Sequence, residues 1–373
     1  MKGLKIGKRA VAVTLIVITI VMALLLVAAA WGGLVHPSKS RFLPFLTLSL
    51  PVVLIINIVI MLAWLLMLKW KYALITVAAI VLAWGPITTV CPLNIFSKSY
   101  DNDSTFKVMT YNVANFSPYD PSNHTPSPSM RYILDQNADF VLLQEGSQER
   151  NYLKLSNTEM MRDELENKYP YHSDGRRDLI ILSKYPYTVV PDSAFDSNHE
   201  YHGGVYAKAF DITFPNGKIL RIVNVHLRSI GMGESDKDLY ADITRRGVNM
   251  KERSELSKIK HSLYGKLKKA FERHAQEAVI VRSMIDKSPV DVIVCGDFNE
   301  APSSYCYRTI RGDDLRDTFQ DCGLGYIHTF HDRRLFFKID HILYRGNLEA
   351  VDWHRDKAGD SDHYPQVATF VWK

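Results

Sequence analysis

Acidic residues are absent from the first 95 residues of this chain, and cysteine is scarce throughout it. Those 95 residues contain eight Lys and Arg side chains and no Asp or Glu. The other 37 of the 45 basic residues face 40 acidic ones in residues 96–373, a net charge of −3. The pI of about 8.8 is therefore a property of the N-terminal part and does not indicate a protein that coats nucleic acid. Four cysteines in 373 residues exclude a disulfide scaffold.

Three apolar stretches lie in the N-terminal part, and we expect each to form a transmembrane helix. Residues 11–31 contain no charged side chain, and as a helix they would extend about 31 Å, enough to cross the hydrocarbon core. Residues 43–67 and 72–90 are similar, although Pro51 and Pro86 should kink or end their helices. A cleaved signal peptide is the alternative for the first stretch, which is longer than a signal core of about 7–15 residues.

Basic residues are distributed unequally around these three stretches. Six lie before the first stretch or between the second and third, whereas only Lys39 and Arg41 lie between the first and second. Because positively charged loops stay in the cytoplasm, this bias predicts a cytoplasmic N-terminus. We expect a membrane anchor over 1–95, a polar tether over 96–105, and a C-terminal domain over 106–373 on the periplasmic or extracellular side.

From residue 106 onward, short apolar runs alternate with turn-rich and helical segments. The runs are nearly continuous, as in strands of a sheet that is covered on both faces. Eight are candidate strands: Phe106–Asn112, Phe140–Gln144, Leu179–Ser183, Val205–Ile212, Leu220–His226, Val290–Cys295, Asp340–Tyr344 and Val367–Val371. A Pro-Asn-Gly segment at 215–217 predicts a hairpin between two of them.

Residues 251–286 have the spacing of one long amphipathic helix, whose apolar stripe includes His274. Within 245–274, ten Lys and Arg residues face three Glu residues. These charges indicate either a solvated face of a helix that covers the sheet, or a basic wall toward a phosphate-bearing substrate or an anionic membrane.

Polar side chains occur at the ends of the predicted strands, where a buried sheet would otherwise exclude them. Each alone fits a local structural role, as a turn residue, a helix cap or a hydrogen-bonded core histidine. Together they contain carboxylates, amides and two histidines, a composition that predicts a common site. They are Asn112, Gln144, Glu145, His226, Asp297, Asn299, Asp340, Asp362 and His363.

In this order, and with the segments GDFN at 296–299 and SDH at 361–363, the set resembles the endonuclease/exonuclease/phosphatase superfamily. The resemblance extends from about Phe106 to Val371, and the three apolar stretches lie outside it. It implies a four-layer α/β sandwich, in which two mixed β-sheets pack face to face with helices outside. It also implies an enzyme that hydrolyses phosphate esters.

The residue types suit a hard divalent cation. We expect Glu145 to be the principal ligand of Mg²⁺, or of Mn²⁺, with Asn112 alongside. Oxygen ligands and the lack of a Cys/His cluster argue against a zinc site of the usual kind. Asp362 would support the metal from a second layer or hold a second ion.

The resemblance also implies roles for the other polar residues. Asp297 would orient and deprotonate the attacking water, and Asn299 would bind a phosphate oxygen. His226 and His363 would donate hydrogen bonds to the pentacoordinate phosphorus in the transition state. Asp340 would hydrogen-bond the final histidine, which fixes its tautomer and favours its protonated form.

The sequence thus predicts a membrane-anchored, Mg²⁺-dependent hydrolase of phosphate esters. Its substrate is either nucleic acid, favoured by the basic stretch 245–274, or a phospholipid or small phosphodiester, favoured by the short tether to the membrane. A non-catalytic membrane receptor or scaffold that retains the fold is the alternative from another class. Whether Cys306 and Cys322 form a disulfide stays open at this point.

Overall fold

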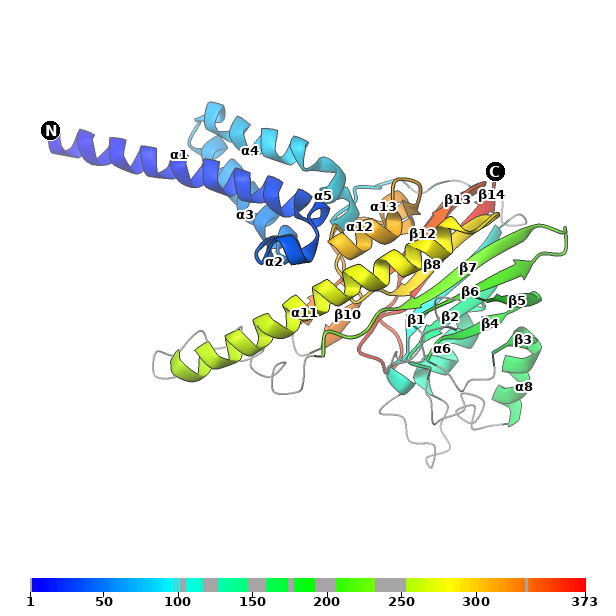
Figure 1. Ribbon diagram of the computed structural model, residues 1–373. Helices are drawn as coiled ribbons and strands as arrows, with labels where there is room; N and C mark the ends of the chain where they lie inside the picture. The colour runs from blue at the N-terminus through cyan, green and yellow to red at the C-terminus, as the bar shows by residue number, and fades with distance from the viewer. Residues whose placement is uncertain are drawn as a thin grey trace.

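The computed structural model describes the following residues: 2–96, 98, 100, 105–116, 127–146, 159–173, 178–191, 206–231, 253–332 and 335–373. A bundle of N-terminal helices lies beside a larger α/β domain (Figure 1). The N-terminus is at the end of the first helix that points away from this domain, and the C-terminus lies in the domain itself.

Five helices form the N-terminal bundle: α1 (Lys2–Trp31), α2 (Leu43–Leu48), α3 (Leu50–Leu66), α4 (Trp70–Leu82) and α5 (Trp84–Val90). Two buried polar contacts join α1 to α3. Asn57 donates to the carbonyl of Met22 at 3.0 Å, and the indole of Trp64 donates to the hydroxyl of Thr19 at 2.8 Å. Many large apolar side chains face outward from the bundle, a surface that soluble proteins rarely carry.

The expectation of three separate transmembrane helices is not confirmed. Among the described residues, one helix, Ala10–Leu34, is long and apolar enough to cross a membrane. It has the length and composition of either a membrane anchor or a signal sequence. The second predicted span is divided at Ser49, and α3 has only 17 residues. The third predicted span is bent by 72° between α4 and α5. It is a second candidate for crossing the membrane only if the two helices together form one span.

Two six-stranded mixed sheets form the α/β domain. The first has the order β13-β14-β1-β2-β4-β3, and the second has the order β5-β6-β7-β8-β12-β9. The strands of the first are β1 (Thr105–Asn112), β2 (Phe140–Gln144), β3 (Tyr171–His172), β4 (Ile180–Ser183), β13 (Leu348–Arg355) and β14 (Gln366–Trp372). Those of the second are β5 (Tyr187–Val190), β6 (Ala207–Thr213), β7 (Ile219–His226), β8 (Asp291–Asp297), β9 (Arg316–Asp317) and β12 (Asp340–Arg345). A small hairpin, β10 (Phe330–Asp332) and β11 (Leu335–Phe337), stands apart from both sheets.

All eight predicted strands are present, and their ends lie within two residues of the predicted ends. One predicted start, Val205, lies outside the described residues. The Pro-Asn-Gly segment joins β6 to β7, which pair antiparallel as predicted. The long amphipathic helix is α11 (Arg253–Asp286). All four cysteines are free, so Cys306 and Cys322 do not form a disulfide.

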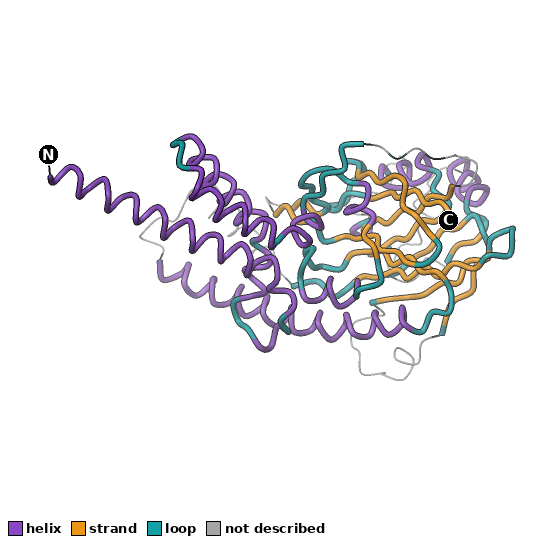
Figure 2. The backbone as a smooth tube through the Cα atoms, turned by 90° about the horizontal axis from the view of Figure 1, so that it is seen from above, coloured by secondary structure: helices purple, strands orange, loops and turns teal. Residues whose placement is uncertain are grey.

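The layers follow from which residues pack together. The apolar core between the two sheets includes Phe106 and Phe140 from the first and Phe210 and Ile293 from the second. On the outer face of the first sheet lie α6 (Pro128–Gln136) and α8 (Glu159–Lys168). On the outer face of the second lie α11 and α12 (Tyr305–Arg311). Strands therefore occupy the middle and helices the outside, as Figure 2 shows, and the expectation of two mixed sheets flanked by helices is confirmed.

The N-terminal bundle packs directly on the α/β domain. Gly33 lies so close to the carbonyl oxygen of Ser303 that a Cβ atom would come within 1.9 Å of it. The hydroxyls of Thr89 and Ser303 are 3.0 Å apart, and Arg308 donates to the carbonyl of Ala30 at 3.0 Å. Of the expected tether 96–105, only residues 96, 98, 100 and 105 are described.

Candidate active site

The sheet topology places the polar strand ends together. Strands β1 and β2 are parallel, so Asn112 and Gln144 stand side by side where both strands end. Strands β7 and β8 are also parallel, and they end at the pair His226 and Asp297. Strand β12 is antiparallel to β8, so its first residue, Asp340, lies opposite Asp297. Residues far apart in the chain thus converge on one edge of the sandwich.

His226 is held by a carboxylate that the sequence did not single out. Its Nδ1 atom lies 2.7 Å from Oδ2 of Asp178, whose other oxygen accepts the backbone N–H of Glu145 at 3.0 Å. Its Nε2 atom is buried and has no hydrogen-bond partner among the described residues. That atom lies 3.7 Å from Oε1 of Glu145 and 4.0 Å from Oδ2 of Asp297. It is therefore a donor directed into the site and free for a ligand.

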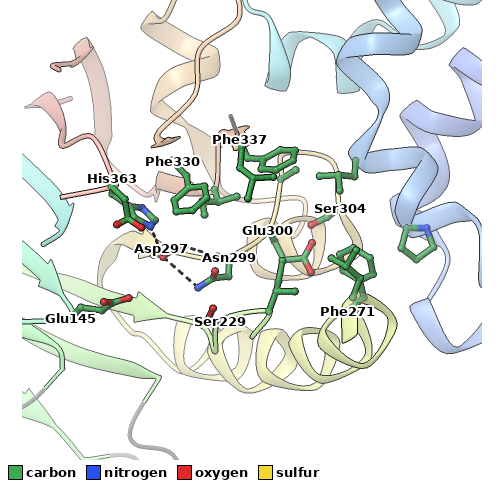
Figure 3. Close-up of a pocket in the computed structure, with 18 residues that line it drawn as sticks. Glu145, Ser229, Phe271, Asp297, Asn299, Glu300, Ser304, Phe330, Phe337 and His363 are labelled. Atoms are coloured by element: carbon green, nitrogen blue, oxygen red, sulfur yellow. Dashed lines mark hydrogen bonds and ion pairs between the residues drawn. The ribbon is translucent and has the colours of Figure 1, made fainter. Parts of the chain in front are cut away.

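His363 is held in the same way. Its Nδ1 atom lies 3.0 Å from Oδ2 of Asp340, and its Nε2 atom lies 3.6 Å from Oδ2 of Asp297. Asp340 is itself fixed by its backbone N–H, which donates to the hydroxyl of Thr329 at 3.1 Å. The two imidazoles thus approach the same oxygen of Asp297, and each has a carboxylate of its own behind it (Figure 3 shows His363, Asp297 and Glu145).

Asp297 is the centre of this arrangement. Its Oδ1 accepts the backbone N–H of Asn299 at 2.7 Å, and its Oδ2 accepts the amide of Asn112 at 3.1 Å. The amide of Asn299 donates to the carbonyl of Leu227 at 2.8 Å. Asn299 takes a φ of 50°, in the left-handed region where residues other than glycine are uncommon and are often part of functional sites.

Asn112 and Glu145 form the opposite side of the site. The amide nitrogen of Asn112 donates to Oε1 of Glu145 at 3.2 Å, while its carbonyl oxygen accepts the backbone N–H of Ala114 at 3.0 Å. Glu145, with a φ of 52°, lines a cavity, and its side chain is 33% exposed. In this orientation Asn112 positions the carboxylate, and it would have to turn its amide to become a ligand itself.

The electrostatics of the site favour charged histidines and a poised base. Burial alone would lower the pKa of His226, but Asp178, Asp297 and Glu145 together raise it to about 9. Burial would also lower the pKa of His363, but Asp340 and Asp297 outweigh it and raise this pKa to about 10. Burial raises the pKa of Asp297 to about 6, against the opposing effect of His363. A carboxylate with a pKa near that value suits a general base at neutral pH.

The charges at the site fit a divalent cation. Five carboxylates gather there, against two imidazoles: Glu145, Asp178, Asp297, Asp340 and Asp362. Asp297 and Asp340 are buried, whereas the side chains of Glu145 and Asp178 are 33% and 30% exposed. An excess of negative charge in such a partly buried site is costly unless a cation compensates for it. The ligand atoms of Asp297, Asp340 and His363 lie within 4.8 Å of one another and could enclose an ion. The raised pKa of His363 instead favours a proton between these two carboxylates, which leaves Glu145 as the better-placed ligand.

A third histidine is fully buried behind the wall of the site. His274, on α11, directs Nδ1 to Oε1 of Glu300 at 2.9 Å and Nε2 to the carbonyl of Arg228 at 2.6 Å. The carbonyl of Arg228 and an ionised Glu300 both only accept hydrogen bonds, an arrangement that favours a proton on both ring nitrogens and thus an imidazolium. Burial would lower the pKa of His274, but Glu300 and the neighbouring Glu277 keep it raised. The ion pair ties α11 to the loop after Asn299.

Two site residues were missed from the sequence. Asp178 begins rather than ends a strand region, but β4 is antiparallel to β2, so the start of β4 lies beside the end of β2. That topology is the signal that could have found it. Asn224 lies inside β7 and accepts the amide of Gln144 at 2.7 Å, with both side chains fully buried between the sheets. It supports the site from behind, and a lone Asn within an apolar strand is the only sequence signal for it.

A cavity of 370 Å³ opens beside these residues. At one end it is lined by Glu145, Asp297, Asn299, Asp362 and His363, and at the other mainly by apolar side chains, together with Glu300 and Ser304. Figure 3 places Phe330 beside His363, and Phe337 and Phe271 further toward the N-terminal helices. Eight of the nine polar residues that the sequence singled out are thus in contact with one another or with this cavity; Gln144 lies behind it.

Comparison with known proteins bears on the same part of the chain. The profile of the endonuclease/exonuclease/phosphatase family matches residues 109–363, which include every residue of the site, and a domain of unknown function matches residues 12–90. No curated protein matches the chain.

Several solved structures share the fold at low sequence identity. An endonuclease/exonuclease/phosphatase from Bacteroides vulgatus is 17% identical, with a TM-score of 0.45, over 72% of this chain and 99% of that one. TDP2 from D. rerio, complexed with a single-strand DNA product, is 15% identical, with a TM-score of 0.43, over 72% and 99%. A mannosyl-6-phosphatase from Bacteroides thetaiotaomicron is 14% identical, with a TM-score of 0.41, over 72% and 100%.

Proposed function

The chain belongs to the endonuclease/exonuclease/phosphatase family, and on that premise we propose that it hydrolyses phosphate esters at the site around Asp297. The observation that carries the proposal is the convergence of two carboxylate-held imidazoles on one oxygen of this residue, at 4.0 Å for His226 and 3.6 Å for His363. A site that transfers a phosphoryl group needs a base for water and positive donors for the phosphate oxygens.

The chain's own residues have distinct roles in this proposal. Asp297 accepts the proton of a water molecule whose oxygen attacks phosphorus, and its raised pKa makes that transfer favourable near neutral pH. The Nε2 atoms of His226 and His363 donate hydrogen bonds to the phosphoryl oxygens, on which negative charge increases in the transition state. Asp340 orients His363. Asn299 would bind a phosphate oxygen with its amide, which here donates to the carbonyl of Leu227 at 2.8 Å and to Oδ2 of Asp297 at 3.3 Å and would have to release one of these partners.

Glu145 is the proposed principal ligand of a Mg²⁺ or Mn²⁺ ion, with Asn112 and Asp362 supporting it. Such an ion would neutralise charge on the phosphate oxygens and lower the pKa of bound water. Asp178 has a positioning role: it holds His226 through Nδ1 and Glu145 through the backbone, so one carboxylate fixes both sides of the site.

We further propose that the bundle anchors the enzyme in a membrane, with the N-terminus in the cytoplasm and the α/β domain on the other side. Two features support this. The outward surface of the bundle is apolar, and Ala10–Leu34 is long and apolar enough to cross a membrane. The orientation rests on Lys69, in the turn between α3 and α4, and on Lys71, in the first turn of α4. This end of the bundle, like the N-terminus, points away from the domain (Figure 1).

The full-length protein, purified in detergent, tests the enzymatic part. With Mg²⁺ it should hydrolyse at least one of bis(4-nitrophenyl) phosphate, 4-nitrophenyl phosphate, plasmid DNA and dioleoyl phospholipids. Asp297→Asn and His363→Gln should each lower the rate at least a hundredfold. The matched controls are Asp352→Asn and His354→Gln, because these two side chains are 47% and 38% exposed. Equal activity in Asp297→Asn and wild type would refute the roles, and inactivity of the wild type on all substrates would favour a non-catalytic receptor.

A further inference from the structure

The cavity at the active site changes character along its length. Beyond Asp297 and His363, its walls are largely apolar, although Ser229, Ser304 and Glu300 also line it, the last with its carboxylate paired to His274. The apolar side chains come mainly from three separate elements. They are Leu267 and Phe271 of α11, Phe330, Leu335 and Phe337 of the β10–β11 hairpin, and Pro44 and Leu48 of α2. A site that recognised only a phosphate and a sugar would have no use for this apolar wall.

The N-terminal bundle completes this wall. Phe45, which follows Pro44 in α2, stacks on Tyr264 of α11 with ring centroids 4.8 Å apart and meets Phe271 edge-on at 5.5 Å. The hydroxyl of Tyr264 also donates to the carbonyl of Arg41 at 3.0 Å. These contacts hold α2 against α11, so one helix of the proposed membrane anchor is also part of the catalytic cavity.

A second cavity, of 200 Å³, lies next to the first along the bundle. It shares Leu48, Ala301 and Phe337 with the first cavity and is further lined by Pro51 and Val52 at the start of α3. Val52 is 58% exposed on the outer surface of the bundle. The two neighbouring cavities thus offer a largely apolar path between the catalytic residues and a surface that, in the proposed topology, contacts lipid.

The charges along this path do not suit a polyanion. Apart from the catalytic His363, Lys338 is the single basic residue among the described residues that line the two cavities. Its ammonium group is already bound, to the carbonyl of Asp340 at 3.0 Å and to Nδ1 of His341 at 2.9 Å. Within 264–274, where side chains are described, Leu267 and Phe271 line the first cavity and the four Lys and Arg side chains line neither. Nucleic-acid affinity depends on several Lys and Arg contacts with the backbone.

We propose that the substrate is a membrane lipid whose phosphate ester reaches Asp297 while its hydrocarbon chain lies against Phe271, Phe337 and Leu48. This inference rests on the proposed function and narrows its substrate to one class, an amphiphilic phosphate ester. It also gives the membrane anchor a second role, because α2 supplies part of the binding surface. The bilayer then delivers the substrate along the path that the two cavities form.

The test compares lipids with soluble esters on the full chain in detergent micelles with Mg²⁺. The lipid probes are phosphatidic acid, phosphatidylglycerol and phosphatidylethanolamine, each with dibutyryl, dihexanoyl and dioleoyl chains. The soluble probes are the two nitrophenyl phosphates and plasmid DNA. For at least one headgroup, kcat/KM should rise with chain length, by up to about fourfold for each methylene that enters the cavity.

Two variants fill the path from different elements: Leu267→Trp from α11 and Leu48→Trp from α2. Each should lower the ratio of lipid to nitrophenyl ester turnover at least tenfold. The matched control is Val279→Trp, on the same helix as Leu267 but 55% exposed, which should keep the wild-type ratio. Using the ratio cancels any general loss of active enzyme through misfolding.

The outcomes separate this inference from the proposed function. Hydrolysis of nitrophenyl esters or DNA without hydrolysis of any lipid would overturn the lipid substrate and leave the phosphoesterase function standing. An unchanged ratio in both filling variants would overturn the assigned path. Inactivity on every probe would overturn the proposed function itself, and the lipid inference with it.

Discussion

Replacing His274 by glutamine should destabilise the domain strongly and in a pH-dependent way. The side chain is fully buried, and its ring donates to Glu300 at 2.9 Å and to the carbonyl of Arg228 at 2.6 Å. The substitution leaves the carboxylate of Glu300, itself only 4% exposed, without its cation. Breaking one side of a buried ion pair costs about 3–5 kcal/mol, which in a domain of this size lowers the unfolding midpoint by about 6–20 °C.

The pH dependence follows from the raised pKa of His274 in the folded state. Burial alone would lower this pKa, but the charges of Glu300 and Glu277 raise it. A group whose folded pKa is raised contributes its full stabilisation below its unfolded pKa, near 6.5, and loses it as the pH rises through the folded value. The difference in stability between wild type and His274→Gln should therefore be largest at about pH 6 and should decrease toward alkaline pH.

Thermal unfolding of the full chain in detergent, followed by circular dichroism at one scan rate between pH 6 and 10, measures this difference. His354→Gln is the matched control, because His354 is 38% exposed and pairs only with exposed carboxylates, whose interactions contribute about 0–1 kcal/mol. A midpoint for His274→Gln within 2 °C of wild type at pH 6, roughly the effect of 1 kcal/mol or less, would refute the reasoning. So would a difference that grows as the pH rises.

Three further predictions concern the site and its anchor. Asp178→Asn should lower kcat/KM most at alkaline pH. In the wild type the pKa of His226 is raised to about 9, and it would fall once its main partner loses its charge. An equal loss of kcat/KM at every pH would contradict this. Removal of divalent cations with EDTA should abolish turnover, and Glu145→Gln should raise the Mg²⁺ concentration needed to restore it at least tenfold; an unchanged Mg²⁺ titration would argue against Glu145 as a ligand. Gly33→Val should loosen the bundle from the domain, because even a Cβ atom would come within 1.9 Å of the Ser303 carbonyl oxygen. Limited proteolysis should then cut between the bundle and the domain faster than in wild type. An unchanged rate of cleavage would contradict the close packing of the bundle on the domain.

Most of the sheet could be predicted because its central strands are buried on both faces. Near-continuous apolar runs as short as Phe140–Gln144, bounded by polar residues, are typical of strands covered on both sides. Strand β13 was missed because it lies at the edge of its sheet and alternates buried and half-exposed residues, as in Val351, Asp352 and Trp353. The length of the apolar stretches predicted helices correctly, but where they end and bend depends on packing within the bundle.

The candidate site was predictable where its residues end strands and unpredictable where long-range packing supplies them. His274 has the spacing of an apolar stripe, and nothing near it in sequence indicates that Glu300 makes it an imidazolium. Asp178 became part of the site through antiparallel pairing of β4 with β2. The apolar half of the cavity requires α2 and α11 to meet, although Phe45 and Phe271 are more than 200 residues apart.

The most direct test of the central claim is to follow the oxygen of water. The best phosphate ester from the substrate comparison is hydrolysed by the full chain in H₂¹⁸O with Mg²⁺, and both products are analysed by mass spectrometry. Attack on phosphorus by a water that Asp297 deprotonates predicts one ¹⁸O in the phosphorus-containing product, none in the alcohol, and no labelled product above background with Asp297→Asn. Label in the alcohol, or equal labelling by Asp297→Asn, would contradict the account.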